Sequence, residues 1–317
     1  MAMPERAGLA GLAGLAGLAG LTVGVTTRNR HQSLLRCLSS LNLLGDALAE
    51  VIVVDDSSDV PVAERLVDMR HTMAPRIRVV RQNESEGNIV GRNTIMRLAT
   101  TEYVLLMDDD AYLVSAAGLT DALAVMENHS EVAAIGCAQA EADGTPWPAR
   151  MQPAPVSYRC RVAAFIGFAH LLRRRAFHEV GGYLEALHFY GEEKVLCARF
   201  LRAGYKVVYL PDVLVAHVPD PSGRNGERYV RYVIRNDCLF ALYNLPWPVA
   251  CVDVPVRLAR YFWMRRNQET NDVSGFFWVV SQVVSALPAA LRGRTPMTWS
   301  DLAEWRRLRH RPPAWLV

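Results

Sequence analysis

The sequence predicts an α/β fold with a mostly parallel sheet. Short, continuous apolar runs alternate with amphipathic segments along much of the chain, and acidic residues follow two of these runs. Strands covered by helices on both faces are typically continuous apolar runs, and their alternation with helices is typical of βαβ units. Ligands of such sheets bind at the carboxyl ends of the strands, so the acidic residues predict a site there.

The elements can be assigned in order. The first predicted strand is LTVGVTT, residues 21–27, and the second is AEVIVVDD, residues 49–56. Between them, residues 32–44 place four leucines on one side of a helix. Helices are predicted near 62–69, 88–99 and 116–127, and strands at 76–82, 103–107 and 132–137. After a proline-containing break at 145–155, a strand and short helix are predicted within 161–183, then a helix ending at Gly204 and a strand at 206–210.

We divide the chain into three regions, 1–20, 21–224 and 225–317. The first contains a Gly-Leu-Ala repeat, and glycine at every third position weakens a helix. We therefore interpret it as a low-complexity tail without a role, and not as a signal peptide or a membrane span. The second is the α/β domain, and the third is predicted to be helical. Its apolar segment 275–291 contains Pro288 and is shorter than a typical membrane span.

Composition restricts the classes of partner. The 317 residues have a formal net charge of +3, and their arginines are dispersed, which argues against nucleic acid as a partner. The six cysteines show no zinc-ligand spacing, so reduced thiols in a cytoplasm are expected. The preference for arginine over lysine, together with abundant alanine, suggests a GC-rich bacterial genome.

Acidic residues gather at two predicted strand ends. Asp55 and Asp56 end one strand, and Asp108, Asp109 and Asp110 end another. Neighbouring carboxylates repel one another unless they are solvated or neutralised by a cation. Mn²⁺ or Mg²⁺ binds to one or two carboxylates together with phosphate oxygens, so the triplet suits a metal ion held against a diphosphate. An exposed acidic turn is the alternative for the triplet taken alone.

Two common phosphate-binding motifs are absent from the sequence, namely GxGxxG after the first strand and GxxxxGK[ST]. The motifs that do occur are, in order, VTTRNR, VVDDSSD, EGNIVGRN, LMDDDA, RRRAFHEVGGY, YGEEKVLCARFLRAGYKVVYLPD and AHVPD. Together, from Leu21 to Asp220, they resemble a family 2 glycosyltransferase of the GT-A fold. The resemblance implies a metal-dependent, inverting transfer from a nucleotide-sugar donor, with UDP- or dTDP-sugars favoured.

The resemblance also implies which residues bind the donor. Asp56 would contact the nucleotide base, with Thr26, Thr27 and Arg28 lining the same pocket and Asp55 ordering the loop. Arg92 matches a position near the base or phosphates, where its guanidinium would pair with an anion; a surface arginine on a helix is the alternative.

The metal site would lie in the aspartate triplet, which fits a DxD motif. Asp110 would bind the metal directly, while Asp108 or Asp109 would bind ribose or metal-bound water. His217 follows the strand at 206–210 and an LPD turn, where family members often carry a histidine near the metal or diphosphate. A structural histidine is the alternative.

The reaction needs a carboxylate that accepts the proton of the attacking hydroxyl or amine. Glu192 and Glu193 begin a predicted helix, where acids are favoured whatever their function. The family pattern is Gly-Glu-Asp followed by a helix with an arginine, which Gly191, Glu192, Glu193 and Arg199 match with Glu in place of Asp. By that spacing Glu193 would be the base, and Glu192 its neighbour toward the acceptor.

Residues 225–317 are expected to lie on the acceptor side, and the acceptor could be a small molecule, a glycan or a lipid-linked molecule. The segment from Thr298 begins with a helix-capping pattern and places Leu302, Trp305 and Leu308 opposite arginines. It could contact the inner face of a membrane, its own chain or a second subunit in a homodimer.

Two other functions remain open from the sequence. A sugar-1-phosphate nucleotidyltransferase also uses acids and a metal, but it is expected to carry a glycine-rich loop after the first strand, and TTRNRHQS has no glycine. A nucleotide-sugar-binding protein without catalysis is the other alternative, and the pair Glu192 and Glu193 argues against it.

Overall fold

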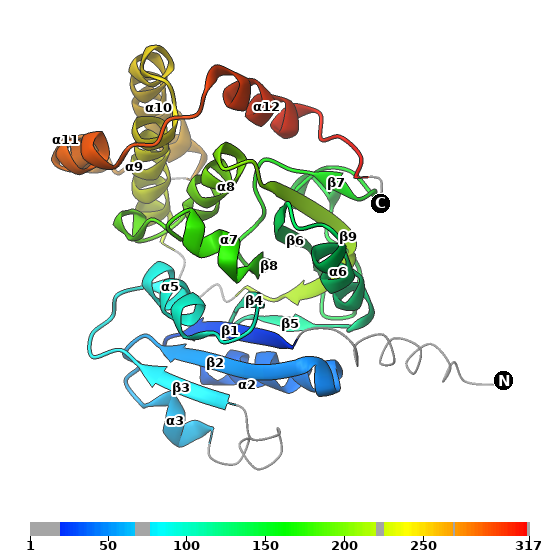
Figure 1. Ribbon diagram of the computed structural model, residues 1–317. Helices are drawn as coiled ribbons and strands as arrows, with labels where there is room; N and C mark the ends of the chain where they lie inside the picture. Colours follow the sequence, from blue (N-terminus) through cyan, green and yellow to red (C-terminus); the bar gives the residue numbers. More distant parts are fainter. Residues whose placement is uncertain (1–19, 67–76, 220–224, 269, 316–317) are drawn as a thin grey trace.

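The computed structural model describes residues 20–66, 77–219, 225–268 and 270–315. Figure 1 shows a central sheet with helices on both faces and a group of C-terminal helices at one end. The predicted tail lies outside the described residues except for Gly20, and so does the end of the helix predicted near 62–69. The predicted boundary near residue 224 also falls on residues outside the described part.

Strands and helices alternate along the first half of the chain, and helices dominate its end. The strands are β1 Leu21–Thr27, β2 Leu48–Asp55, β3 Ile77–Arg81, β4 Tyr103–Asp108, β5 Ala111–Leu113, β6 Val132–Ala140, β7 Cys160–Arg161, β8 Ala169–Arg173 and β9 Lys206–His217. The helices are α2 His31–Ser40, α3 Val62–Arg65, α5 Asn88–Leu98, α6 Ala117–Asn128, α7 Arg174–Glu179, α8 Glu192–Arg202, α9 Gly226–Asn244, α10 Trp247–Asn267, α11 Ser274–Gly293 and α12 Trp299–His310.

The strands lie in the order β3-β2-β1-β4-β8-β6-β9-β5, with β7 paired to β9. The pairs among β1, β2, β3 and β4 are parallel, as the alternation of strands and helices predicts, and β6 is parallel to β9. The strand β8 differs, because it is inserted antiparallel between β4 and β6. It is reached through segment 141–168, which contains the two-residue strand β7 and a short 3-10 turn but no crossover α-helix, so its direction is not restricted to parallel. The sheet is therefore mixed in its second half.

Both faces of the sheet are buried. In β2, Ile52 and Val54 belong to one apolar cluster, while Val51 and Val53 belong to the other. Successive side chains of a strand point to opposite faces, so this alternation shows a core on each side. The apolar runs of the sequence therefore predict the covered strands correctly.

Two glycines bring α5 close to β1. A Cβ atom at Gly24 would lie 2.3 Å from Cγ2 of Ile95, and one at Gly91 would lie 2.5 Å from Cγ2 of Thr26. Such distances are far below van der Waals contact, so larger residues would push the helix away from the sheet. This close packing places the start of α5, with Arg92, at the carboxyl ends of the parallel strands.

The C-terminal helices pack on the α/β part and on one another. α12 begins with the predicted capping box, in which Thr298 and Asp301 bond to each other's backbone N–H groups. Its Leu302, Trp305 and Leu308 are buried within the chain. The sequence left three contacts open for this helix: a membrane, its own chain and a second subunit. In the structure its apolar side packs against its own chain.

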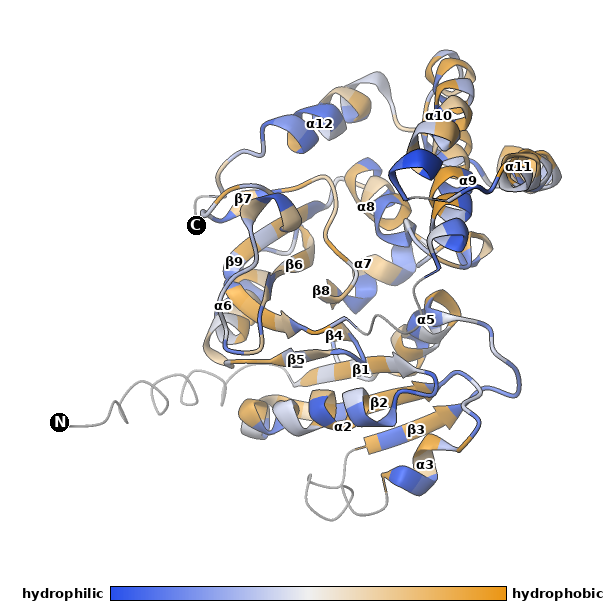
Figure 2. Ribbon diagram, turned by 180° about the vertical axis from the view of Figure 1, so that it is seen from behind, coloured by the Kyte–Doolittle hydropathy of each residue, from blue (hydrophilic) through white to orange (hydrophobic). Residues whose placement is uncertain are grey.

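Apolar side chains are exposed elsewhere in this region. Val256 and Trp263 of α10 are 61% and 59% exposed, and Phe277 of α11 is 68% exposed. Figure 2 shows α11 as a mostly apolar helix at the edge of the molecule. Among the described residues, α11 is the helix whose length and composition would allow it to cross a membrane.

Candidate active site

The three consecutive aspartates diverge in their contacts. Asp109 is buried and accepts a 2.6 Å hydrogen bond from Oγ1 of Thr27 and a 3.1 Å bond from Arg30. Burial raises the pKa of Asp109 to about 7, although Thr27 and Arg30 act in the opposite direction. Its contacts are thus with β1 and the following loop, and it does not join the cluster formed by its two neighbours.

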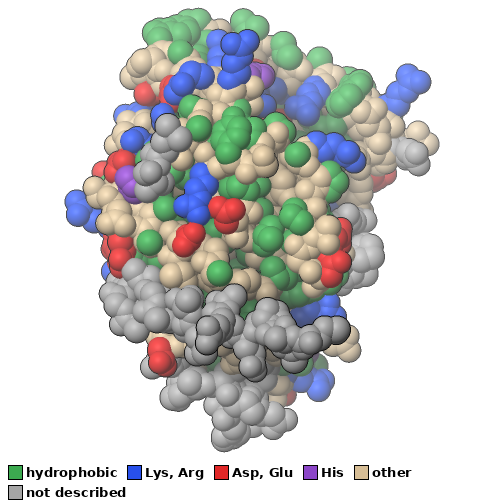
Figure 3. Space-filling view, turned by 90° about the vertical axis from the view of Figure 1, so that its right-hand side faces the viewer, with side chains coloured by type: hydrophobic (Ala, Val, Ile, Leu, Met, Phe, Trp, Pro, Cys, Tyr) green, Lys and Arg blue, Asp and Glu red, His purple; other side chains and the backbone are tan. Residues whose placement is uncertain are grey.

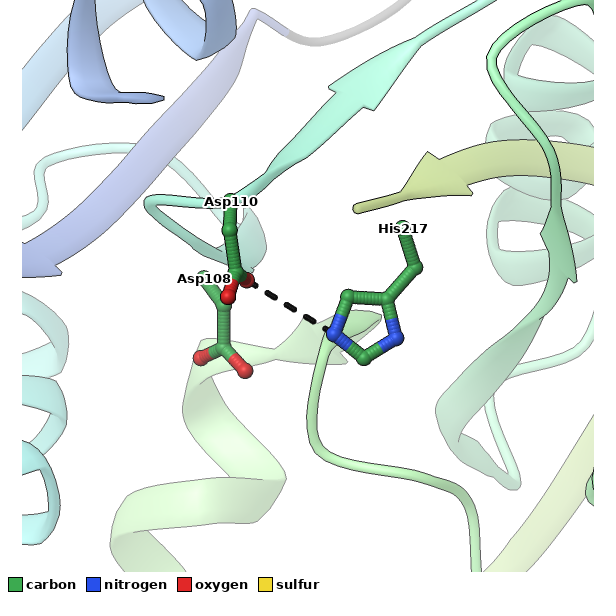
Figure 4. A group of neighbouring side chains, drawn as sticks. All are labelled: Asp108, Asp110 and His217. Carbon is green, nitrogen blue, oxygen red and sulfur yellow. Dashed lines mark ion pairs between the residues drawn. The ribbon is translucent and has the colours of Figure 1, made fainter. Parts of the chain in front are cut away.

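Asp108 and Asp110 form that cluster with His217. One possible ligand atom from each of the three lies within 4.8 Å of the others. Nε2 of His217 is 3.6 Å from Oδ1 of Asp110, as Figure 4 shows. We call these three side chains the acidic cluster.

The strand that carries His217 is longer than predicted. β9 does not end at residue 210 but continues through Pro211 and Asp212, with an irregular register against β6. His217 is its last residue and pairs with Ala111 of β5. The predicted LPD turn is therefore part of the strand, and the strand itself delivers the histidine to the aspartates.

A glutamine orients the histidine. Oε1 of Gln139 in β6 lies 2.8 Å from Nδ1 of His217. Because this oxygen can only accept, Nδ1 carries the proton and donates the bond, and Nε2 lies on the side of Asp110. The histidine ring also stacks on Trp147 and Phe168, at centroid distances of 5.5 and 5.0 Å. Gln139 did not emerge from the sequence, since a glutamine in an apolar strand belongs to no motif.

Arg30 is a second site residue that sequence reasoning missed. Its guanidinium is 3.1 Å from both Asp109 and Asp110. It stands in the VTTRNR motif, next to residues that were assigned to the nucleotide. In this structure it neutralises part of the negative charge that three adjacent carboxylates concentrate at the strand end.

The residues predicted to bind the nucleotide base have several protein partners. Both oxygens of Asp56 accept hydrogen bonds from the loop before α5, from Oγ of Ser85 at 2.8 Å and from the backbone N–H of Glu86 at 2.7 Å. Arg28 is exposed and donates to the same serine at 2.8 Å. Thr26 lies against α5. These side chains form one group between β1, β2 and α5.

Asp55 is hydrogen-bonded to the loop that follows β2 and to Arg81. Its carboxylate accepts 2.8 and 3.0 Å bonds from the backbone N–H groups of Ser58 and Val62, and a 2.7 Å bond from Arg81. These hydrogen bonds hold its pKa below the usual range in spite of burial. The side chain fixes the loop after β2, which contains Asp56.

Arg92 connects the acidic cluster to α8. It is 3% exposed, and it donates to Oδ1 of Asp108 at 2.7 Å, to Oε1 of Glu192 at 2.8 Å and to the carbonyl of Gly167 at 2.6 Å. The prediction placed it near the base or phosphates and expected an anionic partner. Its partners are the two carboxylates, so it is neither a surface arginine nor a residue of the Asp56 group.

The two glutamates that begin α8 have different surroundings. Glu192 is buried against Arg92, whereas Glu193 is partly exposed and lines a cavity. Burial is the main cause that raises both pKa values, and the charge of Arg92 opposes it. Glu192 was predicted to face the acceptor, but its pairing with Arg92 turns it toward the acidic cluster.

Gly167 gives Glu193 its space. A Cβ atom there would lie 2.2 Å from Oε1 of Glu193 and 3.1 Å from Nη1 of Arg92. The backbone of residue 167 is thus one wall for both side chains.

The cavity beside Glu193 has a volume of about 720 Å³. Its walls come from α8, α9, α10 and α12 and from residues 153–155 and 163–164. The size lies within the range of pockets that bind small molecules. The acidic cluster and the cavity are linked through Asp108, Arg92 and the start of α8.

Half of the chain matches a known family. Residues 22–181 fit the family described as glycosyl transferase family 2. The chain belongs to this family. The family assignment and the GT-A fold predicted from the motifs are therefore confirmed.

Among curated proteins, a pre-mycofactocin glycosyltransferase from Mycobacterium tuberculosis is 31% identical over 212 residues, which are 62% of this chain. The matched part is 42% of that relative's length, so the chain spans about two fifths of it.

Solved structures share the fold. The mannosyltransferase PcManGT from Pyrobaculum calidifontis, in complex with GDP-Man and Mn²⁺, has a TM-score of 0.58 and 18% identity over 92% of this chain and 80% of its own. Residues 1–349 of TarS from S. aureus, in complex with UDP-GlcNAc, have a TM-score of 0.56 and 18% identity. The match covers 92% of this chain and 84% of the TarS chain. At 18% identity these likenesses show that this family 2 chain shares the fold of both proteins.

Proposed function

We propose that this glycosyltransferase moves a sugar from a nucleoside-diphosphate sugar to a hydroxyl or amine of its acceptor, with inversion in a single displacement. The observation that carries the proposal is the chain of contacts from Asp110 and Asp108 through Arg92 to the start of α8. It places a cluster suited to a metal–diphosphate beside a cavity lined by Glu193. A leaving group and a base are needed on opposite sides of a reacting sugar, and this arrangement offers both.

The donor side is supported by the group around Asp56. In the proposed complex, Asp56 releases the loop before α5 and accepts a hydrogen bond from the base, with Thr26, Thr27 and Arg28 beside it. UDP- or dTDP-sugars are the favoured donors, by resemblance of motifs. The structures of PcManGT and TarS contain nucleotide sugars, which supports the donor class.

The chemistry of the acidic cluster fits a divalent cation. Two carboxylates and one imidazole are a donor set for Mn²⁺, and Mg²⁺ is the alternative. Asp110, Asp108 and His217 would hold the ion, and Gln139 would fix the histidine. When bound, the cation would neutralise charge on the leaving diphosphate. The motif predicted that Asp108 or Asp109 binds ribose or metal-bound water. We propose that Asp109 instead stabilises the turn between β4 and β5 through its hydrogen bond with Thr27.

On the acceptor side, Glu193 would take the proton from the attacking group. Arg92 would hold Glu192 in place through their ion pair. It would also neutralise the charge of Asp108, so that this charge acts less strongly on Glu193. Region 21–224 would then supply the catalytic site. Region 225–317 would supply most of the walls of the acceptor cavity.

The first test is a thermal-shift screen of nucleoside diphosphates with and without Mn²⁺, followed by an assay of donor hydrolysis. We expect one nucleotide to stabilise the protein only with the metal. Asp110→Asn should remove this response, and Asp46→Asn, at an exposed position of the 3-10 helix Leu41–Ala47, should keep it. No response of the wild type to any nucleotide would contradict the proposal.

The same assays separate the alternatives. A nucleotidyltransferase would form pyrophosphate from a nucleoside triphosphate and a sugar 1-phosphate, and we expect none. A binding protein would show the thermal shift without hydrolysis or transfer.

The proposal also includes a location in the cytoplasm, in contact with the inner face of a membrane. The support is the exposed apolar surface of α10 and α11, with arginines near the ends of both helices. Flotation with anionic liposomes tests it, and Trp263→Ser with Phe277→Ser should reduce flotation. Absence of flotation together with a dimeric mass in light scattering would assign the surface to a homodimer instead.

A further inference from the structure

The cavity beside Glu193 contains a cluster of cationic side chains from three helices. The lining includes Lys194 from α8, Arg257 and Arg260 from α10, and Arg309 from α12. Three acids, Glu193 from α8, Asp237 from α9 and Asp253 from α10, line the same space, so four cations stand against three carboxylates. Apart from Lys194 and Glu193, which follow Gly191 in the motif YGEEKVLCARFLRAGYKVVYLPD, these residues belong to none of the family motifs.

One buried carboxylate is shared by three of the cations. Oδ1 of Asp237 is 3.0 Å from Nζ of Lys194 and 3.2 Å from Nη1 of Arg257, while Oδ2 is 3.5 Å from Nη1 of Arg260. The side chain of Asp237 is 7% exposed, but those of Lys194 and Arg260 are each 49% exposed. Both therefore have N–H donors that face the open space.

The charges around Asp237 do not balance. Arg257 has a second partner in Asp253, so that pair is neutral by itself. The single negative charge of Asp237 is then left to neutralise two positive charges, those of Lys194 and Arg260. Arg309, across the cavity on α12, has no ion pair among the residues that the structure describes. The local excess is positive, and field lines concentrate in such a recess.

Basic side chains also lie on the outer surface. Figure 3, which views the right-hand side of Figure 1, shows several of them at the height of the C-terminal helices, among apolar and a few acidic side chains. A positive rim increases the rate at which an anionic ligand reaches a recess.

Another part of the cavity is apolar. Phe240 and Met264 line it together with Trp305 and Leu308, and the rings of Phe240 and Trp305 are 5.6 Å apart. A molecule that fills the cavity would therefore contact both hydrophobic surface and cations.

We propose that this cavity binds a molecule with an apolar or aromatic body and a carboxylate or phosphate group. The anionic group binds to Lys194, Arg260 and Arg309, and the body packs on Trp305 and Leu308. That this molecule is the acceptor, with its nucleophile toward Glu193, rests on the proposed function; the anion site itself does not.

The test uses fluorinated probes without nucleotide or metal, so its result is independent of the donor experiments. Binding of 4-fluorophenyl phosphate, 3-(4-fluorophenyl)propanoate and the neutral 3-(4-fluorophenyl)propanamide is measured by ¹⁹F NMR on the full chain. We expect both anions to bind at least about tenfold more tightly than the amide, since charge-assisted hydrogen bonds are lost in the amide. The two anions distinguish a phosphate site from a carboxylate site.

Variants locate the binding. Arg260→Gln and Arg309→Gln should each weaken binding of the preferred anion about tenfold, and Arg260→Lys should restore part of it. Arg266→Gln is the matched control, because Arg266 is exposed on the same helix and does not line the cavity. Circular dichroism checks that each variant is folded. Equal binding of amide and anions, or equal losses in Arg266→Gln and Arg260→Gln, would overturn the proposal.

Discussion

Oε1 of Gln139 accepts a 2.8 Å hydrogen bond from Nδ1 of His217, so an apolar strand contributes the residue that orients the histidine toward Asp110. Hydrogen bonds of this kind fix the tautomer of a metal-binding imidazole. The relationship joins β6 to β9 at the point where both strands reach the acidic cluster.

We predict that Gln139→Leu weakens Mn²⁺ binding roughly 10–100-fold, because the imidazole loses its acceptor and its fixed orientation. Titration calorimetry with Mn²⁺ and nucleoside diphosphate measures this. Gln139→Glu keeps an acceptor for Nδ1 but loses the donor to the Met151 carbonyl. It should retain most of the affinity. Wild-type affinity in the leucine variant would show that the bond does not support a metal site.

Gly167→Ala should separate donor binding from chemistry. The added methyl group would overlap Oε1 of Glu193, so the carboxylate must move, and a displacement of about 1 Å can reduce a rate roughly hundredfold. We expect sugar transfer to fall by about this factor while the thermal shift with nucleotide and Mn²⁺ stays unchanged. Gly293→Ala is a matched control, since its Cβ would make an ordinary 3.4 Å contact with Tyr243. Equal rates in both variants would argue against Glu193 as the base.

The pH dependence of the rate should report on Glu193. Burial raises its pKa, and only the ionised carboxylate can accept a proton. The value of kcat/KM should therefore fall about tenfold per pH unit on the acidic side, beginning above the usual pKa of a glutamate. The profile is measured with donor and water or acceptor. Glu193→Gln should lose most of the rate and this acidic limb; an unchanged limb would assign it to another group.

Asp272 should stabilise the C-terminal helices. Its side chain is 3% exposed and accepts bonds of 2.6 and 2.8 Å from Arg231, besides a 2.9 Å bond from the hydroxyl of Tyr261. Asp272→Asn should lower the free energy of unfolding by about 2 kcal/mol at pH 7, because the charge-assisted hydrogen bonds between this carboxylate and the partly exposed Arg231 are lost. Denaturant titration measures this, with Asp46→Asn as the exposed control.

The sign of the accompanying pH effect follows from the pKa of Asp272. The bonds from Arg231 hold that pKa far below its usual range. Its stabilisation is therefore present above the ordinary pKa of an aspartate in the unfolded chain and is lost as the pH falls through and below it. The difference between wild type and Asp272→Asn should shrink in acid; a constant difference would mean that the charge is not responsible.

The sequence predicted much of the fold because buried parallel strands are visible as local apolar runs. The register pairs Thr26 of β1 with Asp108 and Thr27 with Asp55, so the predicted gathering of acids at one edge is confirmed. The insertion of β8 was not predictable, because the choice of neighbouring strand depends on distant residues. The same holds for α12, whose apolar side gives no information about what it packs against.

The site was predictable where a motif has a fixed spacing. Asp110 and His217 are far apart in sequence but meet as expected. Arg92 was recognised, yet its partners were not, since charge alone does not tell which of several carboxylates a guanidinium will contact. Gln139 and Gly167 belong to no motif, and only the surroundings of their atoms connect them with His217 and Glu193.

The two halves of the site differ in when they can form during synthesis. Every residue of the acidic cluster precedes residue 218, whereas Arg260 and Trp305 of the cavity come from α10 and α12. A ribosome-bound chain that has reached the end of β9 thus contains all three side chains of the acidic cluster before α12 exists. Until α12 is made, the cavity lacks one of its walls.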